Sequence, residues 1–507
     1  MSQDSEPLFK TGIDKERDKA FSKISVPNVE DSDDFYYGAF PRALNGDVLL
    51  LLTKLREVGM LMGFKWGCAT SAYQVEGGWN ADGKGESDWD HFVHKHPEKI
   101  DDGSNGDVAC DSYNRFREDV QLLKNMGANM YRFSLSWPRI LPTGDPNNVN
   151  ENGVQYYRDL IDELWANGIE PIVTIYHWDM PQVIADKYTW LDEEIVEKFV
   201  DYCRIVFERF GDKVNYYVTI NEPWAIAAGG FDLGIFPPYK VGTVQKGKLG
   251  LSLDTWWNEP ADPNSQEDIE AANRAMEFKL GIGAYPLLHG CYPPSMRERI
   301  DKNSAAEGRD TSRLPTFSDE WKNKIKGAYD FFGLNHYSSQ LVTTPARAPK
   351  ACPEIRWSIG KPGFDTDQDI FQYHDPTWPS TTTWWCKFVP WGFRKTLNYI
   401  KNEYGNPEVL VTENGCSGER SELQDTERTN FFRGYINDML KAIAVDGCKV
   451  IGYSAWSLLD GWEWGAGNTV TFGIHHVDLE DPLKTRTPRD SAKFLGNIFK
   501  NNGFVKG

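Results

Sequence analysis

The sequence predicts an α/β protein, an eight-stranded (β/α)8 TIM barrel, and three observations lead to this prediction. Beyond residue 63, short and almost continuous apolar or β-branched runs recur eight times, as in parallel strands that are buried on both faces. Longer amphipathic stretches separate most of these runs. An open doubly wound sheet usually carries a G-x-G-x-x-G turn after an early strand, and no such turn is present there. The alternation therefore favours a closed barrel.

The eight expected strands lie in runs that can be read directly from the sequence. They are FKWGCATSAYQVEG from Phe64, ANMYRFSLSW from Ala128, PIVTIYHWD from Pro171, NYYVTINEPW from Asn215, KLGLSLDTWW from Lys248, YDFFGLNHYSS from Tyr329, EVLVTENG from Glu408 and VIGYSAWSLLD from Val450. Apolar residues at spacings of three and four predict helices over 113–126, 154–167, 193–210, 393–404 and 426–446.

One interval breaks this alternation. Between the fourth and fifth runs lie only about two dozen residues, AIAAGGFDLGIFPPYKVGTVQKG, in which no helix is predicted. A parallel crossover needs a dozen or more residues, so the barrel can still close, and we expect an incomplete helical ring after strand four. Residues 1–40 are acidic and lack a period, so we expect residues 1–63 to form an N-terminal arm and residues 64–507 to form a single barrel domain.

Composition excludes several classes of partner. The net charge of −19 and the pI near 5.0 disfavour nucleic acid and anionic membrane surfaces, because like charges repel. The apolar run at 48–62 contains Lys54, Arg56 and Glu57, so no membrane span is expected. No C-x-x-C pair, secretory signal or N-x-S/T acceptor is present. We expect a small neutral ligand, no cofactor, no metal and a cytoplasmic location, or secretion if the true N-terminus differs.

The ends of the expected strands carry the candidate site, because barrel enzymes place their active sites at the C-terminal face. Carboxylates, amides and aromatic rings recur at these ends: Gln74 and Glu76; Arg132 and Trp137; His177, Trp178 and Asp179; Asn221 and Glu222; Asn335, His336 and Tyr337; Glu413 and Asn414; and Trp456, Asp460, Glu463 and Trp464. Glycoside hydrolysis needs two carboxyl groups at the anomeric carbon, polar groups for sugar hydroxyls and rings for the sugar face. A serine nucleophile elbow, a P-loop and an H-E-x-x-H motif are absent from the sequence.

Taken singly, these residues have simpler explanations. A glutamate at a strand end is usually solvated or paired, and Trp456, Trp464 or His177 alone would be read as core. The contexts TINEP and VTENG argue against this for Glu222 and Glu413, since each closes an apolar strand beside an asparagine. His91, His94 and His96 suggest a metal tract, but they lie in a polar stretch, and a solvated loop or helix is the better interpretation.

Seven stretches resemble glycoside hydrolase family 1, the β-glucosidases and their relatives. They are ATSAYQVEGGWNADGKGES, YRFSLSWPRI, YHWDMPQ, TINEPW, FFGLNHYSS, VTENG and WSLLDGWEW, and the resemblance runs from about Phe64 to Phe504. It implies that Glu222 is the general acid/base and Glu413 the nucleophile. It also implies that Gln74, His177, Asn221, Glu463 and Trp464 hold the sugar, that Trp456 lies beneath it, that Asn335 lines the pocket, and that Tyr337 and Arg132 contact the nucleophile.

The resemblance further implies a retaining β-glycosidase that removes a terminal non-reducing β-D-glucosyl, fucosyl or galactosyl residue from small O-glycosides by double displacement. The two carboxyl groups are then expected about 5–5.5 Å apart. Glu222 stands where plant thioglucosidases carry Gln, which favours an O-glycoside, although insect thioglucosidases keep the Glu. Glu463 follows Trp462 where phospho-glycosidases replace the acidic residue, so a neutral glycoside is expected.

The sequence also departs from the family pattern. Residues 41–63 interrupt the lead into the first strand as a probable insertion, and about forty residues are missing after the fourth strand. Gly461, Thr471, Ile282 and Gly283 replace residues that are usual in the family. A non-catalytic glycosidase-like binding protein and a defective isoform are therefore the alternatives, and the oligomeric state is left open.

Overall fold

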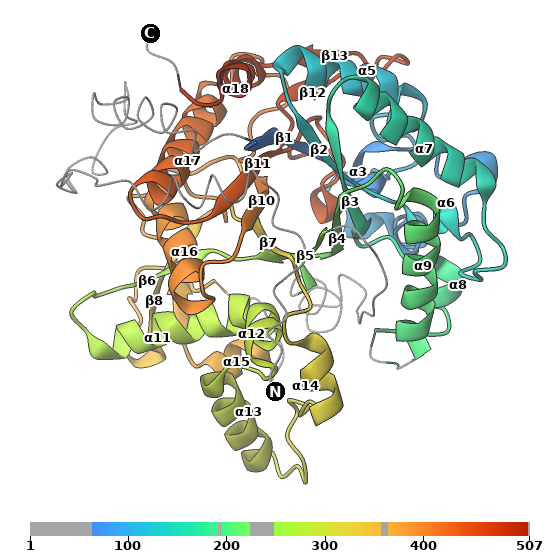
Figure 1. The fold of residues 1–507 in the computed structure, drawn as a ribbon. Coiled ribbons are helices and arrows are strands. Elements are labelled where there is room, and N and C mark those ends of the chain that lie inside the picture. The colour runs from blue at the N-terminus through green and yellow to red at the C-terminus, as the bar shows by residue number, and fades with distance from the viewer. Residues whose placement is uncertain (1–62, 191, 193, 224–247, 356–362, 505–507) are drawn as a thin grey trace, which may run out of the picture.

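Eight parallel strands form a closed barrel in the computed structural model, which describes residues 63–190, 192, 194–223, 248–355 and 363–504 (Figure 1). The order around the barrel is β1-β11-β10-β7-β5-β4-β3-β2. The bounds are β1 (Lys65–Ala69), β2 (Met130–Ser134), β3 (Glu170–Tyr176), β4 (Tyr216–Asn221), β5 (Lys248–Asp254), β7 (Phe331–Asn335), β10 (Val409–Asn414) and β11 (Val450–Trp456). Each strand lies in one of the eight runs identified in the sequence, so the predicted (β/α)8 barrel is confirmed.

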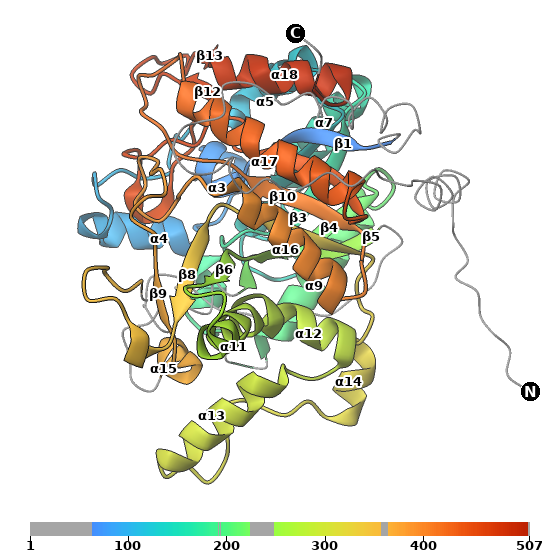
Figure 2. The ribbon, with the colours of Figure 1, turned by 90° about the vertical axis from the view of Figure 1, so that its left-hand side faces the viewer.

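Helices surround the barrel, and the five predicted from the sequence are present within a few residues of their expected ends (Figures 1 and 2). These are α5 (Ser112–Met126), α7 (Glu151–Ala166), α9 (Glu194–Phe210), α16 (Pro390–Glu403) and α17 (Thr426–Ala444). The other helices are α3 (Ala72–Val75), α4 (Asp88–Lys95), α6 (Trp137–Ile140), α8 (Gln182–Ala185), α11 (Gln266–Met276), α12 (Ile282–His289), α13 (Pro294–Ala306), α14 (Asp319–Ile325), α15 (Phe364–Gln368) and α18 (Asp490–Asn501).

The helices between β5 and β7 were not predicted from the sequence. A single π-helical turn, Glu277–Gly281, joins α11 to α12, and Pro286 lies inside α12. Both features interrupt the regular apolar spacing on which helix prediction depends. Figure 2 shows α11 and α12 beneath the barrel, with α13 and α14 projecting below them.

Short strands complete the fold outside the barrel. β6 (Trp257–Pro260), β8 (Ser339–Thr343) and β9 (Phe371–Tyr373) form one sheet, and β12 (His475–Val477) pairs with β13 (Arg486–Pro488). Among the described residues, we find no helix that is both long and apolar enough to cross a membrane.

The barrel interior has two layers of different polarity. Its floor is an apolar cluster contributed by six strands, made of Met130, Ile172, Val218, Phe331, Leu410 and Ile451. Above this floor, towards the C-terminal ends of the strands, the side chains of Arg132, Thr174, Ser252, Asn335 and Thr412 are buried and hydrogen-bonded to one another or to their neighbours. The apolar floor therefore supports a polar layer at the mouth of the barrel.

The barrel closes where the sequence made closure uncertain. β4 pairs directly with β5, with Tyr216, Tyr217 and Val218 opposite Lys248, Leu249 and Gly250. The connecting segment 224–247, in which the incomplete helical ring was expected, lies outside the described residues. The expected arm at 1–63 and the probable insertion at 41–63 also lie outside them, apart from Gly63.

Candidate active site

The two candidate catalytic glutamates lie at strand ends where the sheet register is irregular. Pairing between β4 and β5 shifts between Val218 and Asn221, and pairing of β10 with both neighbours shifts beyond Val411. Such bulges bend a strand and redirect its side chains, and they are frequent beside active sites. Glu222 follows β4 in a left-handed conformation with φ of 49°, and its backbone N–H donates to the carbonyl of Ser252 over 2.9 Å.

Asn335 lies between the two glutamates. Its Nδ2 donates to Glu222 Oε1 over 2.7 Å and to Asn221 Oδ1 over 3.1 Å. In the pairing of β7 with β10, Asn335 also lies opposite Glu413. One residue thus contacts Glu222 and lies opposite Glu413 in the sheet, which places both glutamates at the same side of the barrel mouth.

Glu413 is surrounded by hydrogen-bond donors. Arg132 Nη1 donates to Glu413 Oε1 over 2.7 Å, and the hydroxyl of Tyr337 donates to Glu413 Oε2 over 2.6 Å. Arg132 and Glu413 are both buried, which strengthens their attraction because water does not screen it.

The two carboxyl groups differ in proton affinity for a physical reason. Burial raises the pKa of Glu222 well above its usual value, and the negative charges of Asp254 and Glu413 raise it further. Burial also raises the pKa of Glu413, but the Arg132 guanidinium and the Tyr337 hydroxyl oppose this rise. A nearby guanidinium is expected to lower the pKa of Glu413, and Arg132 does so, but burial outweighs this effect. Glu413 is therefore the more acidic of the pair.

The residues expected to bind sugar converge beside this pair. Gln74 Nε2 donates to Glu463 Oε2 over 3.1 Å, and the amide of Asn221 lies 3.3 Å from His177 Nε2. The His177 ring lies nearly parallel to two indoles, with centroids 5.9 Å from Trp456 and 6.0 Å from Trp464. Strands that are far apart in the sequence thus bring all the predicted substrate-binding side chains to one mouth.

Two polar atoms in this group have no hydrogen-bond partner among the described residues. They are His177 Nδ1 and Glu463 Oε1, and both are buried. Buried polar atoms are normally satisfied, so atoms left unpaired at a barrel mouth indicate a place for a polar ligand. Burial and the nearby Glu413 charge raise the pKa of Glu463 to about 8.

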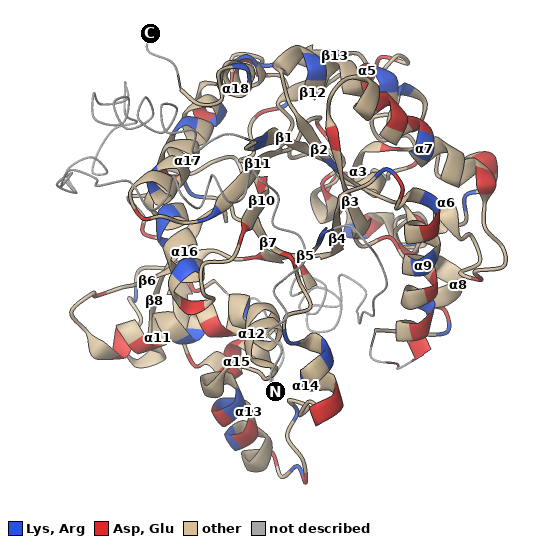
Figure 3. Ribbon diagram, in the orientation of Figure 1, with Lys and Arg blue, Asp and Glu red and all other residues tan. Residues whose placement is uncertain are grey.

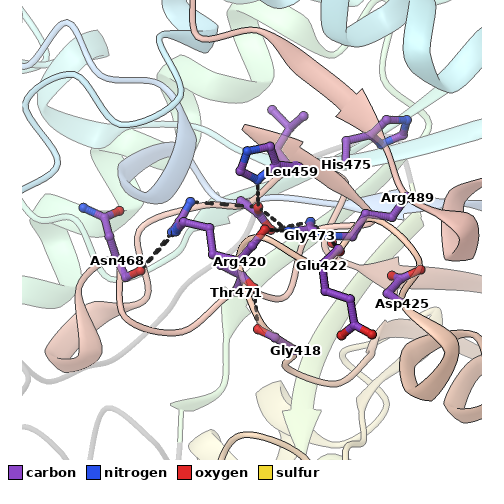
Figure 4. A network of polar contacts seen from close by, with 12 residues as sticks. Gly418, Arg420, Glu422, Asp425, Leu459, Asn468, Thr471, Gly473, His475 and Arg489 are labelled. Carbon is purple, nitrogen blue, oxygen red and sulfur yellow. Dashed lines mark hydrogen bonds and ion pairs between the residues drawn. The ribbon is translucent and has the colours of Figure 1, made fainter. Parts of the chain in front are cut away.

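The loop that carries Glu463 and Trp464 is held by a buried ion pair. Arg489 donates from both terminal nitrogens to Asp460, each over 2.8 Å, and from Nη1 to the carbonyl of Gly473 over 2.7 Å. Figure 4 shows Arg489 in this network and Arg420, whose guanidinium donates to the carbonyl of Asn468. This network fixes the chain immediately before and after the two sugar-facing residues.

Other strand-end residues support the scaffold. Glu76 accepts hydrogen bonds from Arg139 and Tyr157, and Asn414 Nδ2 donates to the carbonyl of His336. The three histidines of the expected solvated stretch lie on or just after α4, facing Glu86, Asp107 and Glu98 respectively. No grouping of three or more metal-ligating side chains occurs in the part of the chain that the structure describes.

Sequence reasoning missed two residues next to Glu222. Asp254 ends β5, the one strand whose end was not considered, so the rule that found the other residues would have found it too. Lys279 forms an ion pair with Asp254 from the π-helical turn. No periodicity in the sequence places Lys279 near the barrel mouth, so no sequence signal could have found it.

Comparison with known proteins agrees with this geometry. Residues 59–243 and 239–504 match the family model described as Glycosyl hydrolase family 1. The chain belongs to this family. Its eight-stranded barrel, two strand-end glutamates and surrounding indoles are thus a family 1 glycosidase scaffold.

The similarity extends to characterised relatives and solved structures. Human cytosolic beta-glucosidase is 41% identical over 471 residues, covering 87% of this chain and 98% of that protein. Human lactase/phlorizin hydrolase is 40% identical over 503 residues, covering 93% of this chain, which spans only 24% of that much longer relative. The solved structure of an aphid myrosinase superposes with a TM-score of 0.80 at 39% identity, covering 87% of this chain and 98% of that one.

Proposed function

We propose that this family 1 chain is a retaining β-glycosidase that hydrolyses the terminal non-reducing β-D-glucosyl, fucosyl or galactosyl residue of small O-glycosides. The observation that carries the proposal is the pair of buried carboxyl groups that differ in proton affinity and lie beside Asn335, which donates to Glu222 and lies opposite Glu413. Retention requires one carboxylate and one protonated carboxyl close together. Glu413, beside Arg132, suits the first role, and Glu222 suits the second.

The reaction proceeds in two displacements. Glu413 attacks the anomeric carbon while Glu222 gives its proton to the leaving oxygen, so the glycosidic bond breaks and an ester to Glu413 forms. Glu222, now a carboxylate, takes a proton from water, and the resulting hydroxide attacks the same carbon and releases Glu413. Two inversions at one carbon give net retention.

The sugar is bound by the residues around this pair. Gln74, His177, Asn221 and Glu463 provide hydrogen bonds to the sugar hydroxyls, and Trp464 closes the pocket beside them. Trp456 supplies an apolar face beneath the ring. The unpaired atoms of His177 and Glu463 support this assignment, since a hydroxyl-bearing ligand would satisfy both.

The names of the relatives and the net charge of the chain narrow the range of substrates. A relative named cytosolic beta-glucosidase and another named lactase/phlorizin hydrolase support a neutral β-glycoside. Figure 3 shows acidic and basic residues together on outer helices such as α9 and α13. The net charge of −19 makes a polyanion such as nucleic acid a poor partner. All eight cysteines are free thiols, which supports a cytosolic location.

The proposal is tested by turnover and by trapping. We expect hydrolysis of p-nitrophenyl β-D-glucoside, with β-fucoside and β-galactoside compared in the same assay, and a loss of at least about a thousandfold in kcat in Glu413→Gln, which removes the nucleophile but keeps its shape. A 2-deoxy-2-fluoro β-glucosyl fluoride should leave one sugar on Glu413, detectable by peptide mass spectrometry. Undiminished turnover in Glu413→Gln would refute the assignment, whereas sugar binding without turnover or an adduct would indicate a non-catalytic binding protein.

A further inference from the structure

Asp254 occupies a position beside Glu222 that is set by the sheet register. It is the last residue of β5, which pairs with β4 on one side and β7 on the other. Ser252, two residues earlier, accepts the backbone N–H of Glu222 through its carbonyl, and its side chain reaches Thr412 inside the barrel. Because alternate residues of a strand share a face, Asp254 points to the same interior, one step nearer the mouth. Its backbone lies opposite Asn335, the residue that holds Glu222.

Lys279 is buried against Asp254. Its ammonium forms an ion pair with Asp254 Oδ2 and lies 4.4 Å above the ring of Trp256. The lysine side chain is 6% exposed and the aspartate side chain 13%. A buried ammonium needs a compensating charge, and the π-helical turn at Glu277–Gly281 is what aims this lysine inward.

The charges that face Glu222 come from several elements. Asp254 on β5 and Glu413 on β10 are negative, and Lys279 on the π-helical turn is positive. Asn335 on β7 donates a hydrogen bond to Glu222, and the hydroxyl of Tyr337 donates to Glu413. Asp254 favours the protonated form of Glu222, while Lys279 and Asn335 favour the carboxylate.

An ion pair between β5 and a helical turn could serve only to anchor that turn. Two features argue for more: Asp254 lies opposite Asn335, which donates to Glu222, and Asp254 Oδ1 is buried without a hydrogen-bond partner among the described residues. A pair selected only for anchoring would be expected to satisfy both carboxylate oxygens. We propose that Asp254 and Lys279 are positioning residues that together set the proton affinity of Glu222, with Asp254 holding it protonated and Lys279 limiting that effect.

This inference rests on the proposed role of Glu222 as general acid, and it predicts opposite effects for the two members of the pair. Asp254→Asn leaves the Lys279 charge uncompensated, so Glu222 should lose its proton more easily. The alkaline limb of the pH profile of kcat/KM, which reports the acid in the free enzyme, should then move to lower pH by about one unit. Lys279→Met leaves the Asp254 charge uncompensated, and the limb should move to higher pH.

The substrate decides whether Glu222 is the group affected. An alkyl β-glucoside needs a proton on its leaving oxygen, so its alkaline limb should shift in both variants. The 2,4-dinitrophenolate of a 2,4-dinitrophenyl β-glucoside leaves without protonation, so the alkaline limb measured with that substrate should shift much less. Lys279→Arg keeps the charge, so its alkaline limb should lie at the same pH as that of the wild type. The alkaline limb of the Asp254→Asn/Lys279→Met double variant should lie closer to the wild-type pH than that of either single variant.

A matched control lies at the other end of the same strand. Lys248 pairs with Glu408 over 2.9 Å at the N-terminal end of β5, so Lys248→Gln removes a strand-end charge far from the mouth and should leave the profile unchanged. Circular dichroism and thermal melting establish that each variant is folded. Unshifted limbs in both folded single variants, or shifts in the same direction, would overturn the inference and leave the pair as an anchor.

The outcome can be separated from that of the proposed function. If the wild-type chain hydrolyses no β-glycoside, the proposed function fails. The inference is then tested by calorimetry, which measures the affinity of a gluco-configured imidazole inhibitor as a function of pH. A ring nitrogen of such an inhibitor is expected to form a hydrogen bond with Glu222, so its affinity depends on the protonation of Glu222. Opposite shifts of its pH dependence in Asp254→Asn and Lys279→Met support the pair's effect on Glu222, and identical pH dependences contradict it.

Discussion

Arg132 contacts four groups on three other strands. Besides Glu413, it donates to Thr174 Oγ1 over 2.9 Å, to Asn221 Oδ1 over 2.6 Å and to the carbonyl of Thr412 over 3.1 Å. Only a planar guanidinium presents enough donors in fixed directions to make all of these contacts at once. Arg132 therefore orients both the nucleophile Glu413 and Asn221, a residue expected to bind the sugar.

We expect Arg132→Lys to lose at least about a hundredfold in kcat/KM, because an ammonium cannot reproduce the several directed N–H donors of the guanidinium. The residual pH profile carries the sharper test. Loss of the close Arg132 contact raises the pKa of Glu413, so the acidic limb should move to higher pH while the alkaline limb stays in place. A profile lowered in height with both limbs unmoved would show that Arg132 does not control the ionisation of Glu413.

Glu463 illustrates a conflict between binding and stability. Its pKa is raised to about 8 in the folded protein, against 4.5 as the ordinary value. Between these values the unfolded chain has lost the proton that the folded chain keeps, so the folded state loses stability as pH rises through this window and no further above it. Each pKa unit corresponds to about 1.4 kcal/mol, so the total amounts to several kcal/mol.

Glu463→Gln removes this ionisation. We expect its melting temperature to equal that of the wild type near pH 4.5 and to exceed it increasingly up to about pH 8. The same variant should bind sugar more weakly, with KM raised, because an amide nitrogen can only donate, whereas either oxygen of the carboxyl group can accept from a sugar hydroxyl. Parallel melting curves with no growing difference would contradict the raised pKa of Glu463.

The loop after β11 depends on one buried ion pair for its position. Asp460 and Arg489 are both fully buried and form a two-pronged contact. Replacing Arg489 with Met should reduce the free energy of unfolding by about 3–5 kcal/mol, because it removes the two-pronged partner of a buried carboxylate and leaves, among the described residues, only His476 at 3.3 Å and Arg420 at 3.9 Å as its ion-pair partners. It should also raise KM, since Glu463 and Trp464 follow Asp460 closely.

A second variant separates these effects. Asp460→Asn/Arg489→Met removes the stranded charge, so urea unfolding should recover much of the lost stability while KM stays raised. A double variant that is no more stable than Arg489→Met alone would mean that the lost stability comes from the ion pair itself and not from the charge of Asp460 left without Arg489.

The strands and the site residues were predictable from sequence for one shared reason. Parallel strands buried on both faces give apolar runs, and their C-terminal ends meet at one mouth, so the polar and aromatic residues directly after each run make up most of the site. The bulges that turn Glu222 and Glu413 inward were not predictable, since they arise from pairing with other strands. Lys279 was missed for the same reason, because its place depends on how α11 and α12 meet.

The closed barrel is assembled entirely between Lys65 and Trp456, and the family model begins at residue 59. We propose that residues 1–63 are an arm outside the barrel domain and that residues 41–63 are an insertion, of which only the last five residues fall within the family match. Deleting residues 41–62 should leave the far-ultraviolet circular dichroism, the melting temperature and kcat/KM close to those of the full chain. A deleted chain that aggregates or melts much earlier would show that this segment is part of the folded domain.

The two layers of the barrel interior have a consequence for heating. Apolar contacts such as those of Met130 and Phe331 in the floor become relatively stronger on warming, whereas the mouth is held mainly by hydrogen bonds, whose favourable enthalpy does not grow in this way. Heat should therefore loosen the mouth while the floor stays closed. We expect a range of temperatures in which turnover falls reversibly and circular dichroism is still that of the folded chain. Activity and ellipticity that decay together would mean that the barrel melts as one unit.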